Sequence, residues 1–186
     1  VAVMLEIIQG EGGIHLASLD YQKALRQFCD QHELLMICDE VQCGMARTGK
    51  WFGYQHAGIQ PDIATLAKGL GSGVPIGACM AGGRAAGLFG PGNHGSTFGG
   101  NPLVCAAAFA TVQAIEDENI LANVNEMGNY FKEKLVAFKE KYDFILDVRG
   151  KGLLLGMELA MKGTDIVAKC LEKGVIINCT HDTVLR

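Results

Sequence analysis

A lysine and an aspartate end two apolar segments of this chain, and together they could hold a reactive aromatic aldehyde. Lys68 ends the segment Asp62–Lys68 and opens the glycine-rich turn Gly69–Gly73, and Asp39 ends another apolar run 29 residues earlier. A lysine amine can form a Schiff base with an aldehyde, and a carboxylate can keep a pyridine nitrogen protonated so that the ring withdraws electrons. The two residues together indicate a pyridoxal phosphate (PLP) site.

The segment that begins at Asp39 supplies two further groups suited to a substituted pyridine. Val41 has a β-branched side chain that can press on a ring face, and the Gln42 amide can hydrogen-bond a phenolic oxygen. Glu40, between them, is included among the expected cofactor-binding residues. Taken singly, Asp39 is more often a strand-end or capping carboxylate and Lys68 a solvated lysine, but their combination favours the PLP interpretation.

The elements around these residues predict an α/β fold with a mostly parallel sheet. A strand over residues 1–8 and a helix over about 20–32 are followed by three short apolar runs typical of buried parallel strands, at 34–39, 62–67 and 77–81. Ligands of such sheets bind outside the carboxyl ends of the strands, which is where Asp39 and Lys68 fall. We therefore expect the two side chains to lie close together.

The second half of the chain predicts two long helices and a smaller α+β lobe. Pro102 is well placed as the first residue of a helix to about Glu118, and a second helix covers about 120–141. The elements that follow are strands at 144–148 and 152–158, a helix near 164–173 and a strand at 175–178. Because Val1 is not an initiator and Arg186 lies in a strand-like pattern, we expect a fragment of a longer chain.

Composition favours a small-molecule ligand. The 186 residues are 49% hydrophobic, enough for a filled core, and the net charge of -4 provides no basic surface for nucleic acid or anionic lipid. No apolar run approaches the roughly 20 residues that span a bilayer. Seven cysteines without metal-binding spacing predict no metal site and indicate buried free thiols in a reducing cytoplasm.

Three ordered motifs resemble those of class III aminotransferases: Asp39-Glu-Val-Gln42, Thr65–Leu70 with Val74–Ala78, and His94–Pro102. Within the family, the similarity is greatest to acetylornithine aminotransferases. It covers essentially the whole chain and implies a fold-type-I PLP enzyme. The implied domains are the C-terminal part of the PLP-binding large domain at 1–118, a bridging helix at 119–141 and a truncated small C-terminal domain at 142–186.

The resemblance implies roles for residues of these motifs. Lys68 resembles the Schiff-base lysine, Asp39 the partner of the pyridine nitrogen, Val41 the ring-stacking residue and Gln42 the partner of the ring hydroxyl. Thr97 resembles a threonine that reaches the cofactor phosphate of the neighbouring subunit, with Ser96 beside it at the substrate. A homodimer is therefore implied, although from the residues alone Ser96 and Thr97 favour an ordinary polar loop before a helix.

The resemblance also implies a pair that selects substrates. Glu11 resembles a glutamate that holds a substrate-binding arginine, and Arg186 resembles that arginine, which grips carboxylates through its planar guanidinium. Without the family resemblance, Arg186 would be interpreted as a solvated chain end.

Two positions depart from the family pattern, with Ile7 in place of a proline and Ala46 in place of a glycine. The family also has a first half, with a phosphate loop, a ring-stacking aromatic and a further arginine.

The implied reaction moves the terminal amino group of N2-acetylornithine to 2-oxoglutarate, giving glutamate, as a step of arginine biosynthesis. The alternatives are an ornithine, succinylornithine or 4-aminobutyrate aminotransferase, and an inactive structural fragment of such an enzyme.

Nucleotide binding has weak support. Gly44–Lys50 matches the Walker A spacing but is followed by Trp51, where Mg²⁺ binding needs a hydroxyl. Likewise Gly69, Gly71 and Gly73 do not form GxGxxG.

Overall fold

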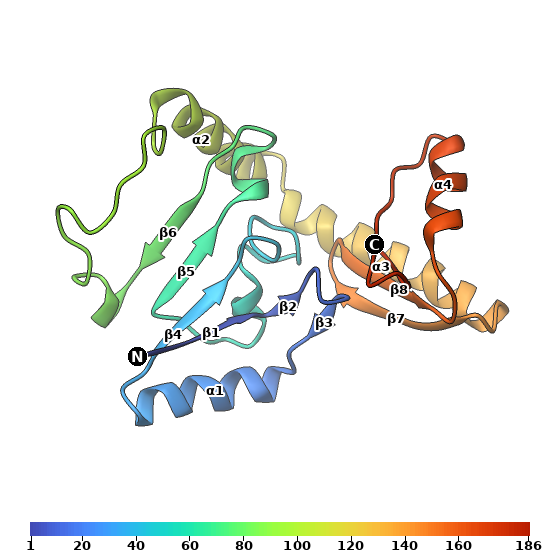
Figure 1. The fold of residues 1–186 in the computed structure, drawn as a ribbon, viewed down its shortest axis with the longest axis horizontal. Coiled ribbons are helices and arrows are strands. Elements are labelled where there is room, and N and C mark those ends of the chain that lie inside the picture. Colours follow the sequence, from blue (N-terminus) through green and yellow to red (C-terminus); the bar gives the residue numbers. More distant parts are fainter.

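Two β-sheets, joined by a long helical connection, form the architecture of residues 1–186 in the computed structural model (Figure 1). The first sheet has the order β1 (Ala2–Glu6), β4 (Leu35–Asp39), β5 (Ile63–Leu66), β6 (Ala78–Ala81). The second has the order β7 (Ile145–Lys151), β8 (Leu154–Leu159), β10 (Val184–Leu185), β9 (Cys179–Thr180). A small hairpin of β2 (Ile8–Gln9) and β3 (His15–Leu16) lies between them. We call the first sheet with its helices the first lobe and the second sheet with α4 (Thr164–Glu172) the second lobe.

The parallel core of the first sheet confirms the predicted α/β architecture. Strands β1, β4 and β5 are parallel, and their register places Glu6, Asp39 and Thr65 side by side at the carboxyl ends. Helix α1 (Leu19–Gln31) begins at Ser18, whose side chain accepts a hydrogen bond from the Tyr21 amide, and it packs against β4. The continuous apolar sequence of β4 and β5 explains their burial, whereas β1, at the edge of the sheet, has no buried residue.

The prediction that residues 77–81 form a buried parallel strand is wrong. Strand β6 runs antiparallel to β5 and is exposed along its length. The connection from β5 contains only the short 3-10 helix η2 (Lys68–Gly71) and a turn, whereas a parallel crossover needs a dozen or more residues and usually a full helix. An apolar run by itself does not distinguish strand direction, so sequence periodicity could not settle this point.

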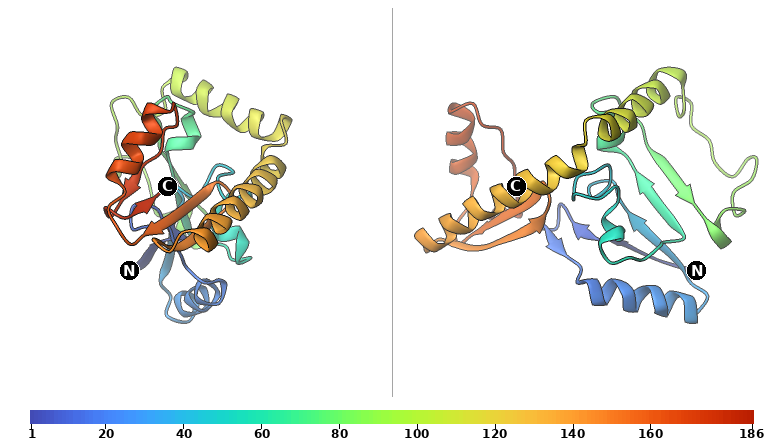
Figure 2. Two further views of the ribbon diagram at one scale, coloured as in Figure 1. Left: turned by 90° about the vertical axis from the view of Figure 1, so that its right-hand side faces the viewer. Right: turned by 180° about the vertical axis from the view of Figure 1, so that it is seen from behind.

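Helices α2 (Pro102–Asp117) and α3 (Ile120–Lys141) confirm the two predicted long helices. Asn101 caps α2 by accepting a hydrogen bond from the Val104 amide, with Pro102 at the first helical position. Helix α3 runs from the first lobe to the second, where it packs against β7 and β8 (Figure 2). The domain limits at 118 and 141 remain a prediction.

The strand predicted at 175–178 is irregular, and the pairing occurs further along the chain. Thr180 pairs with Val184 in the antiparallel β9–β10 hairpin. His181 and Asp182 form the intervening turn with positive φ of 49° and 59°, values that His and Asp adopt more readily than most residues. The turn therefore sets the register, and the apolar residues before it stay outside the ladder.

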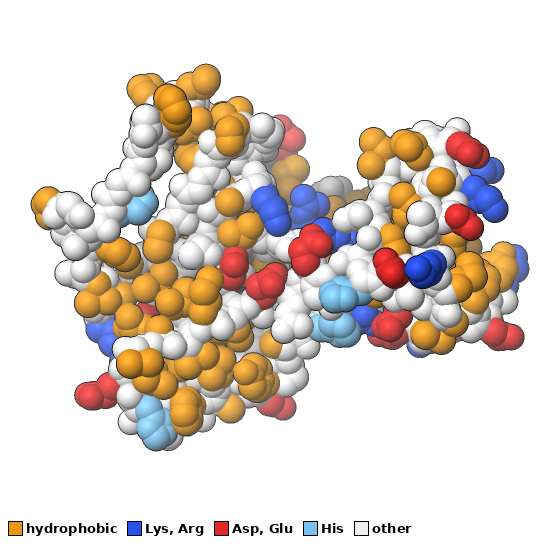
Figure 3. Space-filling model, in the orientation of Figure 1, with side chains coloured by type: hydrophobic (Ala, Val, Ile, Leu, Met, Phe, Trp, Pro, Cys, Tyr) orange, Lys and Arg blue, Asp and Glu red, His pale blue; other side chains and the backbone are white.

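Charged side chains gather where the two lobes meet, whereas hydrophobic side chains cover much of the visible face of the first lobe (Figure 3). No helix is both long and apolar enough to cross a membrane.

The seven cysteines are free, and only Cys29, Cys38 and Cys43 are buried. The expectation of mainly buried thiols therefore holds for fewer than half of them. Burial raises the pKa of Cys38 and of Cys43 to about 12, which makes these two thiols unreactive.

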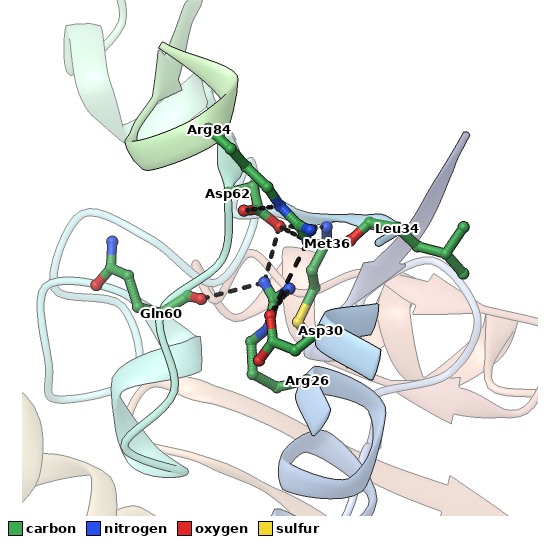
Figure 4. A network of polar contacts seen from close by, with 7 residues as sticks. All are labelled: Arg26, Asp30, Leu34, Met36, Gln60, Asp62 and Arg84. Atoms are coloured by element: carbon green, nitrogen blue, oxygen red, sulfur yellow. Dashed lines mark hydrogen bonds and ion pairs between the residues drawn. The ribbon is translucent and has the colours of Figure 1, made fainter. Parts of the chain in front are cut away.

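At the amino-terminal edge of the first sheet, Asp62 joins three elements (Figure 4). Its Oδ2 accepts hydrogen bonds from Arg26 Nη1 of α1 at 2.9 Å and from the Met36 amide of β4 at 2.7 Å. Its Oδ1 accepts from Arg84 Nε at 3.0 Å. Although burial opposes ionisation, the hydrogen bonds from Arg84, Met36 and Arg26 lower the pKa of Asp62 to about 2.

We expect the Asp62→Asn substitution to lower the free energy of unfolding of the full-length protein by about 1–3 kcal/mol at neutral pH. A carboxyl whose folded-state pKa is lowered stabilises the fold above its unfolded-state pKa and loses that effect as pH falls through the folded-state value. The difference from wild type should therefore shrink between about pH 4 and pH 2. Urea unfolding at several pH values measures it, with the exposed Asp143→Asn as control. A constant difference across this range would contradict the assignment.

Candidate active site

Asp39 occupies the carboxyl end of β4 with one carboxylate oxygen held and the other free. Its Oδ1 accepts hydrogen bonds from the Val41 amide at 3.0 Å and from Thr65 Oγ1 at 3.2 Å. Its Oδ2 makes no hydrogen bond within the chain, so this oxygen can accept one from a ligand. Sequence reasoning did not single out Thr65 as a site residue, although its place at the end of the neighbouring parallel strand is a signal that could have identified it.

Lys68 follows β5 and begins η2 in an unusual backbone conformation. Its φ of 46° lies in the left-handed region, which is uncommon for a residue with a Cβ atom. Such strained conformations cluster at functional sites. The Lys68 amine forms no hydrogen bond or ion pair within the chain, and the residue lines two cavities of about 680 and 310 Å³. An unpaired amine between two cavities can react with a ligand that enters either.

The smaller cavity brings together predicted site residues from both lobes. We call it the arginine cavity. Val41 and Gln42 follow β4, Lys68 follows β5, and Arg186 ends the chain after β10. The other lining residues, which sequence reasoning missed, are Gly44, Met45, Arg47, Gly69, Leu153, Leu154, Leu155 and Asn178. Because β8 and the β9–β10 hairpin contribute side chains, this cavity exists only where the two lobes pack together.

Arg186 and Glu11 form an ion pair at the rim of the arginine cavity. The Arg186 guanidinium also donates from Nη1 to Gln42 Oε1 at 3.1 Å. The last backbone position is held, because Arg186 and Asn178 exchange hydrogen bonds of 2.9 and 3.0 Å. Arg186 thus continues the β9–β10 hairpin by one backbone pair, with its side chain directed toward Gln42 and Glu11, and it is not a solvated chain end.

The larger cavity shares Lys68 with the arginine cavity and is also lined by Val74–Gly77, by Ser96 and by Val104 of α2. The predicted substrate residue Ser96 therefore lines the same cavity as Lys68, and its Oγ accepts a hydrogen bond from the Gly99 amide at 2.9 Å. Thr97 lines neither cavity and is exposed. Its role at a neighbouring subunit remains a prediction.

Glu40 is a correction to the predicted cofactor-binding set. Its side chain is 1% exposed, and its carboxylate accepts hydrogen bonds from the amides of Gly53 at 2.8 Å and Tyr54 at 3.0 Å. Burial raises the pKa of Glu40, against the effect of these two bonds. Because successive side chains of an extended segment point to opposite sides, Glu40 faces the interior and holds the 3-10 helix η1 (Gly53–His56).

The two nucleotide-binding alternatives do not fit the structure. Gly44–Lys50 forms consecutive turns that no α-helix follows, and Lys50 Nζ donates to the Gln55 carbonyl at 3.0 Å. Gly69–Gly73 leads into β6. A P-loop and a dinucleotide fingerprint both present phosphate to the amino terminus of a helix, which is missing at both positions.

The residues at this edge of the sheet fit PLP. The free Lys68 amine suits an aldehyde, and the unpaired Asp39 Oδ2 suits a protonated ring nitrogen. Val41 and Gln42 supply an apolar contact and an amide at the wall of the arginine cavity. This combination of groups is what a substituted pyridine aldehyde requires, so the chemistry expected from the sequence has a matching site.

Comparison with known proteins assigns a family to this site. The family model described as aminotransferase class-III matches residues 1–186. An acetylornithine aminotransferase of Methanocaldococcus jannaschii is 56% identical over 185 residues, which are 100% of this chain and 46% of that protein. One from Nitrosomonas europaea is 48% identical over 186 residues, with 100% and 47% covered. The chain thus spans about half the length of the curated relatives it matches.

Solved structures confirm the expected fold class. An acetylornithine aminotransferase from Elizabethkingia anophelis superposes with a TM-score of 0.93 at 38% identity, covering 100% of this chain and 48% of that one. An ornithine aminotransferase from Toxoplasma gondii, described with partial occupancy of PLP at its active site, has a TM-score of 0.94 at 37% identity, with 100% and 45% covered.

Proposed function

Because this chain belongs to the class-III aminotransferases, which depend on PLP, we propose that the whole protein transfers the terminal amino group of N2-acetylornithine to 2-oxoglutarate. The observation that supports this best is the Glu11–Arg186 ion pair beside Lys68. A reaction that uses two dissimilar substrates at one site needs a cationic group that binds the carboxylate of one substrate and is neutralised when the other is bound. Arg186 can be this cationic group, and Glu11 can neutralise it.

N2-acetylornithine is the preferred donor because the curated relatives with 48–56% identity reported above are acetylornithine aminotransferases. The solved acetylornithine and ornithine aminotransferases are equally similar to this chain, at 38% and 37% identity. Ornithine remains the second candidate, since the Toxoplasma gondii structure has a TM-score of 0.94. Succinylornithine and 4-aminobutyrate are further alternatives of the same chemistry. The proposed reaction would serve arginine biosynthesis.

PLP, when bound, supplies an electron sink that makes a proton on the neighbouring substrate carbon acidic. Asp39 would hold the proton of the ring nitrogen through its free Oδ2, while Thr65 and the Val41 amide keep Oδ1 in place. Val41 and Gln42 would hold the ring. The Lys68 amine would move the proton at the substrate carbon that bears the amino group.

The Glu11–Arg186 pair would select between the two substrates. When the donor presents its terminal amine, Glu11 neutralises Arg186, so that no free cation faces the donor ammonium. When 2-oxoglutarate enters, its α-carboxylate takes the place of Glu11 on the planar guanidinium. Gln42 holds one edge of that guanidinium through its Oε1.

We also propose that the whole protein is a homodimer, in which Thr97 of one subunit approaches the cofactor phosphate of the other. The exposed position of Thr97 beside Ser96 supports this, because an exposed side chain that lines neither cavity beside Lys68 is available to another subunit. The alternative for the chain alone is an inactive fragment, since it spans about half of its relatives.

The substrate proposal is tested by steady-state kinetics of the full-length protein with 2-oxoglutarate and four donors: N2-acetylornithine, ornithine, succinylornithine and 4-aminobutyrate. We expect the highest kcat/KM for N2-acetylornithine, and a higher value for any other donor would replace it. Whether residues 1–186 alone form the site is tested by absorbance titration with PLP, borohydride reduction and peptide mapping. Label on Lys68 supports the site, whereas label spread over many lysines supports the inactive fragment.

A further inference from the structure

The loop Gln9–Gly13, which carries Glu11, is hydrogen-bonded to both lobes. It begins at the last residue of β2 and leads toward β3, and the Gly10 amide donates to Oε2 of Glu6, the last residue of β1, at 3.1 Å. Gly10 is also packed against Gln42, because a Cβ atom at Gly10 would lie 2.2 Å from the Gln42 amide. The beginning of the loop is therefore fixed to the first lobe.

The rest of the loop is held by two side chains of the second lobe. Thr180 Oγ1 donates to the Glu11 carbonyl at 2.7 Å, and Arg149 Nε donates to the Gly13 carbonyl at 2.9 Å. Thr180 is 8% exposed, so water has little access to replace its hydroxyl. The backbone of Glu11 is thereby attached to a strand that is far from it in sequence.

Thr180 and Arg186 belong to the same hairpin, so the hydrogen bond from Thr180 to Glu11 also fixes the position of Glu11 relative to Arg186. Thr180 pairs with Val184, and Arg186 exchanges two backbone hydrogen bonds with Asn178, so the ladder sets the separation of Thr180 from Arg186. One end of the hairpin holds the Glu11 carbonyl, and the other end meets the Glu11 carboxylate.

We propose that Thr180 is a positioning residue that aligns Glu11 with Arg186, with Arg149 supporting the same loop; this rests on the proposed function of the pair. The Glu11 side chain is 68% exposed, and exposed ion pairs are weak unless their geometry is imposed. One hairpin both holds the Glu11 carbonyl and carries Arg186, so the backbones of the two partners are fixed relative to each other. Rotation of their side chains can then release Arg186 without displacement of the loop.

The test compares Thr180→Val with Thr180→Ser in the full-length protein. Valine has nearly the shape of threonine but no hydroxyl, whereas serine keeps the donor. We expect amide hydrogen exchange in residues 9–13 to accelerate about threefold to tenfold in Thr180→Val, the effect of one lost hydrogen bond, and to stay within about twofold in Thr180→Ser. Arg149 also binds Asp147 and Glu158, so its removal would disturb the second sheet and is the less specific test.

Kinetics then separates positioning from a merely structural role. In Thr180→Val, Arg186 is held less firmly, so we expect KM for 2-oxoglutarate to fall and KM for the amine donor to rise, shifting their ratio about threefold to tenfold, with kcat unchanged. Unchanged exchange and an unchanged ratio would overturn the inference, as would a Thr180→Ser variant that behaves like Thr180→Val.

Glu11→Ala distinguishes failure of the inference from failure of the proposed function. If Glu11→Ala shifts the ratio of the two KM values but Thr180→Val does not, Thr180 does not position the pair. If Glu11→Ala itself leaves the ratio unchanged, the substrate-selecting role of the pair is wrong, and the inference that depends on it falls for that reason. If both variants shift the ratio in the same direction, the inference is supported.

Discussion

Replacement of Lys68 by alanine in the full-length protein is expected to abolish amino-group transfer and to leave the fold intact. The Lys68 amine makes no hydrogen bond or ion pair within the chain, so its removal costs little structural energy. It is, however, the one amine that lines both cavities. Loss of the group that holds the cofactor and moves the proton should lower kcat by at least about 10⁴-fold.

The measurement is the rate of 2-oxoglutarate-dependent amino transfer, together with circular dichroism to verify folding. Lys50→Ala is the matched control, because Lys50 is also an exposed lysine beside a glycine, and its amine contacts only the Gln55 carbonyl. We expect the control to keep wild-type turnover. A Lys68→Ala enzyme with near-normal turnover would rule out Lys68 as the reactive amine.

Replacement of Asp39 by asparagine is the second large effect, and here the geometry makes the substitution specific. The amide oxygen of asparagine can take the place of Oδ1, which accepts from the Val41 amide and Thr65 Oγ1. The other position becomes an NH₂ group, which cannot accept a hydrogen bond from a protonated ring nitrogen. We expect PLP binding to remain and the rate of proton removal from the substrate to fall by at least about 10²-fold.

Single-turnover kinetics with the amine donor measures this step, and the substrate kinetic isotope effect should grow as proton removal becomes rate-limiting. Thr65→Val is the companion variant, because it removes one of the two hydrogen bonds that orient Asp39 but leaves the charge. A smaller loss, of about tenfold or less, is expected there. An Asp39→Asn enzyme within threefold of the wild-type rate would show that the carboxylate charge is not used.

The sequence patterns sufficed for most of the elements that carry the site. Continuous apolar runs predicted β4 and β5, and the proline at residue 102 predicted the start of α2. These are local signals, since a buried strand must be apolar and a helix must satisfy its first amides. The errors arose where the outcome depended on pairing: the direction of β6, the place of the last strands, and the side to which Glu40 turns.

The sequence by itself determined which chemical groups are present, their family resemblance and the two strand ends at which Asp39 and Lys68 stand. The family resemblance also implied the Glu11–Arg186 pair. Only the tertiary structure decided that Gln42 joins Arg186 and that Thr180 holds the Glu11 carbonyl, across separations of 144 and 169 residues. Residue type and spacing encode local conformation, because neighbours along the chain restrict each other directly. Contacts between distant residues depend on how the two sheets pack and on the hairpin register, which no local pattern contains.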